Sequence, residues 1–413
     1  MTPYVSSPMT GRIGAASCSA VLRGVADTRH IARRPANADR RRRRRLTGAC
    51  ARRFDLPPKL LYPAPMAYTL TDLPALLAHA FDTIIDVRSP AEFAEDHVPG
   101  AVNMPVLSNA ERAEVGTIYT QESPFKARKI GATRVARNAA TAIETHLLDR
   151  EGGWQPLVYC WRGGQRSGSF TSILQQIGWR AQVLEGGYQS WRRHVVAQLY
   201  EGTLPVKLIR LDGYTGTAKT ELIKRVAPLG AQTLDLEGLA CHRGSVLGDI
   251  DGDQPAQKGF ETALLSELSA LDPAKPVLIE AESARIGTLR LPPALWVAMK
   301  DSPRIVVEAA PHHRARFLAE AYVDLFHDTQ ALTDRLNHLR PHAGHATVDH
   351  WLSLLQTNQP QALAQALVTD HYDPAYARLT KSKSAAPIAT IDAGDLSDAA
   401  LDTAARTITS HLR

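Results

Sequence analysis

The chain has 413 residues, of which 22% are charged and 44% hydrophobic, and it carries a formal net charge of +6. This length allows two or three domains, and the lack of any apolar run of about 18 residues excludes a membrane-spanning helix. Residues 1–65 hold 14 Lys/Arg against 3 Asp/Glu, so residues 66–413 have a net charge of −5 and the basic excess belongs to the amino-terminal segment.

Residues 1–65 are predicted to form a disordered, Arg-rich extension. Arg40 to Arg45 are six consecutive arginines surrounded by Pro, Ala and Ser, with little periodic apolar pattern. Three interpretations stay open: an RNA-binding or targeting arm, a solvated tail, or a stretch upstream of a true start at Met66, where the globular pattern begins.

The four cysteines are Cys18, Cys50, Cys160 and Cys241. They form no CxxC pair and show no metal-ligand spacing with histidine, so neither a metal site nor a disulfide framework is predicted. The weakly apolar segment 13–25 does not fit a secretory signal, and a cytoplasmic location is favoured.

From residue 66 onward, short β-rich runs alternate with helical patterns, which predicts an α/β fold with largely parallel sheets. The turn-rich segment 201–205 follows a helical stretch and precedes a strand, so we predict one domain over 66–200 and another over 201–413. The predicted strands are Thr83–Val87, Leu157–Cys160, Ala181–Leu184, Lys207–Leu211, Val277–Glu280 and Arg304–Glu308.

The loop that follows the predicted strand 157–160 is expected to bind an anion. A helical pattern begins at about Gln165, so Cys160 lies at the end of a strand and faces the start of a helix. Loop amides and the helix dipole favour negative charge on the sulfur, which lowers the thiol pKa and stabilises a thiolate, persulfide or perselenide. Cys160 is therefore the candidate nucleophile, and the anion loop consists of Arg162, Gly163, Gly164, Gln165 and Arg166.

Two reactions fit a cysteine followed six residues later by an arginine. Cysteine-dependent phosphatases form a phosphocysteine on such a loop, although they usually have histidine before the cysteine, where this chain has Tyr159. The upstream segments 86–93 and 97–105, however, resemble the two signatures of the rhodanese family, over about residues 68–195. There, Asp86 and Arg88 are either a structural ion pair or a catalytic pair that supports Cys160.

A second phosphate-binding loop follows the predicted strand 207–211. Residues 212–220 read D-G-Y-T-G-T-A-K-T and precede a helical pattern, which is the context of a P-loop. Backbone amides and the Lys219 charge suit phosphate oxygens, and the Thr220 hydroxyl is able to bind Mg²⁺. The usual glycine before the lysine is replaced by Ala218, which is unfavourable if this position needs a positive φ. The predicted phosphate-binding residues are Gly213, Gly216, Thr217, Ala218, Lys219 and Thr220.

The expected place of a Walker B aspartate holds glutamates instead. The predicted strand 277–280 ends at Glu280, and Glu282 follows two residues later. These carboxylates either polarise a ligand or act as a base, or they are surface groups at a strand end. No ATPase apparatus is evident.

The order of a rhodanese-like domain followed by a P-loop domain resembles the tRNA 2-selenouridine synthase family. Beyond the two loops, the resemblance rests on the segments 111–119, 236–245, 257–261, 280–287 and 371–376, and it covers most of residues 66–380. It implies a rhodanese-like α/β domain followed by a P-loop NTPase-like α/β domain with a helical C-terminal part.

The resemblance also implies a reaction, in which selenium replaces sulfur in wobble 2-thiouridine of tRNA by way of an S-geranylated intermediate. The implied co-substrates are selenophosphate and geranyl diphosphate, no cofactor is firmly implied, and Mg²⁺ is a candidate ion. The implied partner is tRNA, with a selenophosphate-supplying enzyme as a candidate, and neither DNA nor a membrane is expected. A second-domain site would include Glu237, His242, Arg243, Glu280, Glu282 and Arg285.

A wobble base has to be unstacked and held by aromatic or guanidinium faces. The candidates are Trp161, Tyr188, Trp191, Arg192, Arg193, His242 and Arg243. Core packing stays open as the alternative for each aromatic residue, and a solvated surface position for each arginine. Because residues 66–413 are net negative while phosphate contacts supply much of the affinity for RNA, we also expect a local basic surface near the loops. It would include Lys126, Arg128, Lys129 and Arg134.

Three other functions stay open from the sequence. They are a phosphatase that acts through Cys160, a P-loop kinase with a regulatory rhodanese-like module, and a non-enzymatic sulfide carrier. The sulfide carrier leaves residues 201–413 unexplained.

Overall fold

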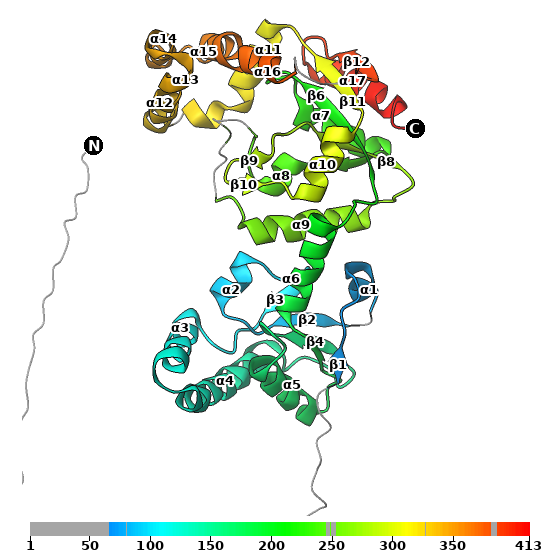
Figure 1. Cartoon of the computed structure of the whole chain (residues 1–413), viewed down its shortest axis with the longest axis vertical. Coiled ribbons are helices and arrows are strands. Elements are labelled where there is room, and N and C mark those ends of the chain that lie inside the picture. The colour runs from blue at the N-terminus through cyan, green and yellow to red at the C-terminus, as the bar shows by residue number, and fades with distance from the viewer. Residues whose placement is uncertain (1–65, 80, 245–247, 249–252, 327, 381–385) are drawn as a thin grey trace, which may run out of the picture. The chain divides into compact units, whose positions relative to one another are not determined.

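The structure is a computed structural model that describes residues 66–413 apart from residues 80, 245–247, 249–252, 327 and 381–385. The Arg-rich segment 1–65 and its three interpretations lie outside the described residues. The described chain contains two five-stranded sheets in which every pair of neighbouring strands is parallel (Figure 1).

The first sheet has the strand order β1-β5-β4-β2-β3. Its strands are β1 Ala67–Tyr68, β2 Thr83–Asp86, β3 Ala101–Asn103, β4 Pro156–Tyr159 and β5 Gln182–Leu184. The connecting helices are α1 Leu73–Ala78, α2 Pro90–Glu95, α3 Asn109–Thr117, α4 Pro124–His146, α5 Gln165–Ile177 and α6 Tyr188–Val196. Single π-helical turns, Ile118–Glu122 and Ala197–Glu201, follow α3 and α6.

Helices cover both faces of this sheet, and the side chains of the central strand β4 point alternately to one face and the other. Leu157 packs in a cluster with residues of α1 and α6, whereas its neighbour Val158 packs with residues of α4 and α5. Successive side chains of a strand point to opposite faces, so both faces of a central parallel strand are buried. Cys160 directly follows β4 and belongs to the second cluster.

The second sheet has the order β12-β11-β6-β8-β7. Its strands are β6 Lys207–Gly213, β7 Gln232–Leu234, β8 Pro276–Glu280, β11 Arg304–Glu308 and β12 Ala389–Asp392. It is accompanied by the helices α7 Lys219–Val226, α8 Leu236–Ala240, α9 Gln257–Ala270, α10 Pro293–Asp301 and α17 Asp398–Ser410, and by a hairpin of β9 Arg285–Ile286 and β10 Leu289–Arg290. The phosphate loop therefore follows the central strand β6.

A helical region interrupts the second sheet between β11 and β12. It comprises α11 Pro311–Ala321, α12 Thr329–His338, α13 Arg340–Ala343, α14 His345–Gln356, α15 Pro360–Leu367 and α16 Asp373–Thr380, with a 3-10 turn Val323–Phe326 after α11 and a π-helical turn Val368–Tyr372 before α16. A hydrophobic cluster centred on the fully buried Trp351 holds α12, α14 and α15 together. The chain then returns to the sheet, where α17 packs against α7.

The α/β class with parallel sheets and a helical region is confirmed, and each of the six predicted strands is present with its ends within two residues of the prediction. No helix among the described residues is both long enough and apolar enough to span a bilayer.

Candidate active site: a cysteine loop and a phosphate loop

Cys160 begins a tight loop between β4 and α5 whose path depends on glycine. Gly163 has φ +66°, and a β-carbon there would lie 2.7 Å from the carbonyl oxygen of Leu184. Gly187, which is beyond the predicted loop, has φ +58°, and a β-carbon there would clash with the carbonyl oxygen of Cys160. The sequence signal for this contact is the Gly186-Gly187 pair after β5, which our sequence analysis missed.

The thiol of Cys160 is 3% exposed and lies in an anion-stabilising environment. Burial by itself raises a thiol pKa, but hydrogen bonding by Ser167 and the charge of Arg166 outweigh it, so the pKa of Cys160 is lowered. The Ser167 hydroxyl lies 3.2 Å from Sγ and donates to it. The predicted thiolate-favouring loop thus has a geometric basis, and Ser167 is a further contributor that the sequence analysis did not include.

Arg166 has a second partner besides the thiol. Its Nη1 lies 2.9 Å from Oε2 of Glu92, a residue of α2 whose carboxylate also caps that helix by accepting from the backbone of Ser89. Burial raises the pKa of Glu92, but the hydrogen bond and charge of Arg166 outweigh it and keep that pKa lowered. Part of the Arg166 charge is therefore neutralised before any ligand arrives.

Asp86 and Arg88 form a buried ion pair beneath the cysteine loop. Arg88 Nη2 lies 2.6 Å from Asp86 Oδ2, and their side chains are 1% and 0% exposed. The same nitrogen donates to the carbonyl oxygen of Asp96, and the guanidinium lies over the Tyr188 ring at 3.9 Å. Buried on all sides by protein groups, the pair has the geometry of a structural support.

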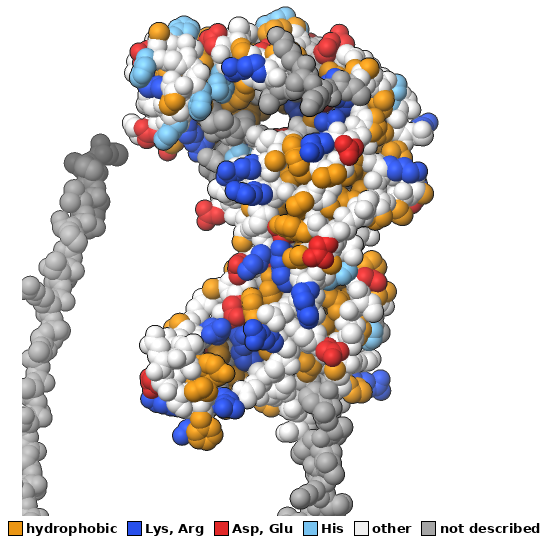
Figure 2. Space-filling view, viewed as in Figure 1, with side chains coloured by type: hydrophobic (Ala, Val, Ile, Leu, Met, Phe, Trp, Pro, Cys, Tyr) orange, Lys and Arg blue, Asp and Glu red, His pale blue; other side chains and the backbone are white. Residues whose placement is uncertain are grey.

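Two hollows border the cysteine loop. One, of about 900 Å³, is lined by Gln165 and Arg166 and by the basic residues Arg112, Arg128 and Lys129. Figure 2 shows Lys and Arg side chains gathered next to α3 on this part of the molecule. Of the other two predicted basic residues, Lys126 pairs with Glu122 and Arg134 with Glu114.

The other hollow, of about 780 Å³, lies on the Trp161 and Arg162 side of the loop. Arg192 and Arg193 also line it, and Arg192 pairs with Glu261. Tyr188 lines it too, although this residue is 2% exposed and its hydroxyl donates to Asp96. Trp191, by contrast, is fully buried. The base-stacking role predicted for Trp191 is therefore wrong, because this side chain belongs to the core.

The phosphate loop joins β6 to α7 and contains the strained residue that the sequence suggested. Gly213 has φ +153° and Gly216 has φ +84°, and a β-carbon at Gly213 would lie 2.6 Å from the carbonyl oxygen of Val307. Ala218 has φ +58° and ψ +33°, which is the left-handed region that favours glycine. The condition under which Ala218 is unfavourable is therefore met.

Lysine and hydroxyl groups of the phosphate loop are tied to neighbouring oxygens. Lys219 Nζ donates to the carbonyl oxygen of Gly213 at 3.1 Å, and Thr217 Oγ1 donates to that of Tyr214 at 2.9 Å. Thr220 Oγ1 donates to Oε2 of Glu237 at 2.6 Å. The Thr220 hydroxyl thus meets a carboxylate that the sequence had placed in the same site.

Three predicted glutamates gather next to the loop. The backbone N–H of Glu237 donates to Oε2 of Glu280 at 3.2 Å, and Glu280 is 1% exposed. A β-carbon on Gly244 would lie within 3.0 Å of both Glu237 and Glu282, so these two carboxyl groups flank the same glycine. Glu280 is therefore not a surface carboxylate, whereas Glu282 is half-buried next to Glu237.

The environment of these glutamates favours their protonated forms. Burial first, and then the charge of Glu237, raise the pKa of Glu280 and of Glu282 to about 8. Burial also raises the pKa of Glu237, against the lowering effect of Thr220 and Lys219. Carboxyl groups that keep their protons near neutral pH do not repel a bound phosphate and are able to donate a hydrogen bond to it.

The remaining predicted residues of the second site lie around this cluster. His242 is 4% exposed, and its Nδ1 accepts from the backbone N–H of Gly244 at 3.0 Å. The guanidinium of Arg243 lies 4.7 Å from the centre of the Tyr322 ring. Arg285 is exposed on the β9 hairpin.

Sequence analysis missed the groups that brace the phosphate loop from the helical region. The Tyr376 hydroxyl donates to Oδ1 of Asp212 at 2.7 Å, and Asp212 is the residue directly before Gly213 of the loop. Arg314 is 3% exposed, donates to the carbonyl oxygen of Thr215 at 3.1 Å and pairs with Asp373 at 2.7 Å. Asp373 and Tyr376 fall in the segment 371–376, so that resemblance held a signal for this bracing.

Comparisons with known proteins agree with this two-site arrangement. The family model described as tRNA 2-selenouridine synthase AAA domain matches residues 206–406, and the model described as rhodanese-like domain matches residues 69–194. Each half of the chain, with its own sheet and loop, thus has its own match.

Curated relatives named tRNA 2-selenouridine synthase match both halves. The relative from Aeromonas salmonicida is 32% identical over 329 residues, which cover 71% of this chain and 86% of the relative. The relative from Pseudomonas syringae pv. tomato is 30% identical over 331 residues, which cover 73% and 89%. For the relative from Alcanivorax borkumensis, which is 36% identical over 246 residues, the match spans 66% of its length. With both loops in place and most of two relatives covered, the chain belongs to the tRNA 2-selenouridine synthase family.

Proposed function

We propose that this protein replaces sulfur by selenium in wobble 2-thiouridine of tRNA, using geranyl diphosphate and selenophosphate in two successive steps. The observation that carries the proposal is the presence, in one chain of this family, of a thiol with a lowered pKa on an anion loop and a phosphate loop lined by proton-holding glutamates. Neither loop alone accounts for a reaction that needs both a diphosphate and a soft nucleophile.

In the first step the thiouridine sulfur attacks C1 of geranyl diphosphate. A C–S bond forms, the C–O bond to the diphosphate breaks, and diphosphate leaves with the bonding electron pair, while the proton on N3 of the base is released to water. Loop amides at 213–220 and the Lys219 ammonium would stabilise the charge that develops on the leaving group. A protonated Glu282 next to the loop is a suitable donor to one of its oxygens.

In the second step the selenium of selenophosphate attacks C2 of the base. A C–Se bond forms, the C–S bond breaks, and the geranylthiolate leaves with the bonding electron pair and takes up a proton. Water then cleaves the P–Se bond, which releases phosphate and leaves 2-selenouridine. The Cys160 loop would carry or direct this nucleophile, because its amides, Arg166 and the α5 amino terminus favour an anion at this position. The buried position of Cys160 keeps bulk water away from a reactive selenium species.

The basic hollow lined by Arg112, Arg128, Lys129 and Arg166 supports binding of a tRNA backbone. The second hollow is lined by Trp161, Arg192 and Arg193, an aromatic ring and guanidinium groups of the kind that hold an unstacked base. We therefore propose that the anticodon loop approaches the cysteine loop along these two hollows.

Mass spectrometry of tRNA nucleosides tests the proposed function. A strain that lacks this protein should contain no 2-selenouridine, and the wild-type gene should restore it. Complementation with Cys160→Ala should fail, whereas Lys224→Ala, which changes an exposed lysine of α7, should succeed. Failure of the wild type to restore 2-selenouridine would refute the assignment.

A further inference from the structure

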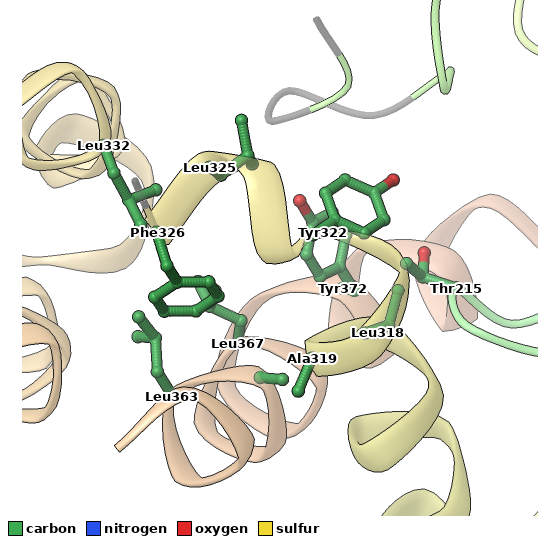
Figure 3. A pocket seen from close by; sticks show the side chains of 11 residues that line it. Thr215, Leu318, Ala319, Tyr322, Leu325, Phe326, Leu332, Leu363, Leu367 and Tyr372 are labelled. Carbon is green, nitrogen blue, oxygen red and sulfur yellow. The ribbon is translucent and has the colours of Figure 1, made fainter. Parts of the chain in front are cut away.

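An apolar pocket opens directly beside the phosphate loop. Figure 3 shows Thr215 of that loop with Leu318 at one end of the pocket, Tyr322 next to them, and Phe326, Leu332 and Leu363 at the other end. Most of the lining side chains are aliphatic or aromatic, and the hydroxyl groups belong to Thr215 and two tyrosines. Polarity therefore falls with distance from the phosphate loop.

The pocket and the loop share the helix α11. Arg314 of α11 donates to the carbonyl oxygen of Thr215, and one turn later Leu318 packs so closely on the loop that a β-carbon on Gly216 would lie 2.9 Å from it. Ala319, the next residue, lines the pocket. The apolar wall thus begins at Thr215 and Gly216, in the middle of the phosphate loop.

A site with this layout suits a ligand that has an anionic head and an apolar tail. The head would accept from amides of the loop, and the tail would replace water on aliphatic and aromatic surfaces, which is favourable in proportion to the area covered. A nucleotide suits it less, because a ribose and a base would leave polar groups without partners against leucine side chains.

We propose that this pocket holds the hydrocarbon chain of the diphosphate ligand and selects that ligand by its chain. The inference rests on the proposed function, which requires a diphosphate at the 213–220 loop, and it adds where the chain lies and which residues recognise it.

The dimensions of the pocket make the inference quantitative. About 50 Å³ of it can hold the centre of a water-sized group, and the empty space reaches about 490 Å³ when its open side is included. A single water molecule needs roughly 10–15 Å³ of space for its centre, so the narrow part of the pocket, with about 50 Å³, has room for about four water-sized groups. Roughly one isoprenoid unit therefore fits there, and a longer chain extends along the open side.

Calorimetric titration of the full-length protein with diphosphates of increasing chain length tests this inference. The series is inorganic pyrophosphate, dimethylallyl diphosphate and geranyl diphosphate. Each carbon that leaves water contributes, so affinity should rise along the series, by about tenfold or more from pyrophosphate to geranyl diphosphate. Equal affinity for all three compounds would overturn the inference.

Ala319→Leu should shorten the pocket without touching the loop. We expect it to weaken geranyl diphosphate about tenfold and to leave pyrophosphate binding unchanged. Ala321→Leu is the matched control, because Ala321 lies on the same helix but is exposed and does not line the pocket. Leu363→Ala widens the far end, and it should shift the preference toward a longer chain, farnesyl diphosphate.

The outcomes separate the inference from the proposed function. Selenouridine synthesis in cells together with chain-independent binding would overturn the pocket assignment alone. In the opposite case, binding depends on chain length and Ala319→Leu removes this dependence, but the protein does not restore 2-selenouridine. This result would refute the tRNA reaction while the pocket assignment stands. Equal loss of pyrophosphate and geranyl diphosphate in Ala319→Leu would show damage to the loop and would count against the pocket.

Discussion

The two anion loops of this protein follow central strands of parallel sheets, yet they are built in opposite ways. In the cysteine loop, each backbone position with positive φ is a glycine, and the reactive group is part of the loop. In the phosphate loop, Ala218 occupies a left-handed position, and the neighbouring side chains are carboxyl groups with raised pKa.

This difference indicates what each loop handles. The cysteine loop stabilises an anion on its own sulfur, by means of Ser167 and Arg166. The phosphate loop has no nucleophile of this kind, and its lysine and protonated glutamates are suited to an anion that arrives and leaves with a substrate. One loop therefore fits the carrying of a nucleophile, and the other fits the release of a leaving group.

The largest expected effect concerns the tight backbone around Cys160. Gly187→Ala places a methyl group against the Cys160 carbonyl oxygen at φ +58° and ψ −149°, a conformation that is nearly restricted to glycine. We expect a loss of about 3 kcal/mol in the free energy of unfolding, measured by urea denaturation.

Gly168→Ala is the matched control for this substitution. Gly168 lies inside α5, and a β-carbon there meets no atom within 4 Å, so alanine should stabilise the helix by about 0.5–1 kcal/mol. If both substitutions changed the free energy of unfolding equally, the close approach of Gly187 to the Cys160 carbonyl oxygen would not restrict the residue type at position 187.

The next effect tests the protonated glutamates of the phosphate loop. Burial, and then the charge of Glu237, raise the pKa of Glu280 to about 8, whereas the carboxyl of an unfolded chain titrates near about 4.3. Between about pH 5 and pH 8 the folded state holds a proton that the unfolded state lacks, so stability should fall as pH rises. Glu280→Gln should remove up to about 1 kcal/mol of this loss per pH unit.

Unfolding curves of wild type and Glu280→Gln across this pH range provide the measurement. The exposed Glu221→Gln serves as the control, because solvent screens a charge at that surface position. Parallel pH curves for wild type and Glu280→Gln would contradict a proton-holding Glu280.

A smaller effect concerns the thiol itself. Ser167→Ala removes a hydrogen bond that helps to lower the pKa of Cys160, so the thiol pKa should rise and less thiolate should be present at neutral pH. The thiolate absorbance, followed during a pH titration in a background where Cys18, Cys50 and Cys241 are replaced by serine, reports this change. An unchanged titration would mean that Arg166 and the loop amides suffice without the hydroxyl.

The smallest effect is expected for Ala218→Gly. Relief of the left-handed conformation gains about 1–2 kcal/mol, whereas the added freedom of glycine costs about 0.5–1 kcal/mol and the lost buried methyl about 0.8 kcal/mol. The free energy of unfolding should therefore change by less than about 1 kcal/mol. A loss above about 2 kcal/mol would show that the methyl group is required for packing.

Sequence patterns predicted the inner strands of both five-stranded sheets but not their edge strands. The six predicted strands include the three inner strands of each sheet, whose apolar runs are buried on both faces. Within the two five-stranded sheets, the strands that were not predicted are the four edge strands β1, β3, β7 and β12, and the short β9–β10 hairpin was not predicted either. They have two to four residues, and a strand with one neighbour and partial exposure has a weak apolar pattern.

The candidate sites divide in the same way. Cys160, its loop and the phosphate loop could be located because their residues are consecutive in the chain. The contacts of Gly187, Arg314 and Tyr376 join segments that are far apart in sequence, so only the fold reveals them. Trp191 shows the converse, because its type suggests base stacking while its position is in the core.

The division of labour between the two loops can be measured with purified protein and an anticodon stem-loop RNA. One reaction supplies 2-thiouridine RNA with geranyl diphosphate, and the other supplies the geranylated RNA with selenophosphate. We predict that Lys219→Ala loses the first reaction and keeps the second, and that Cys160→Ala does the reverse, with Lys224→Ala active in both. Loss of the same single reaction in both Lys219→Ala and Cys160→Ala would contradict the assignment of one step to each loop.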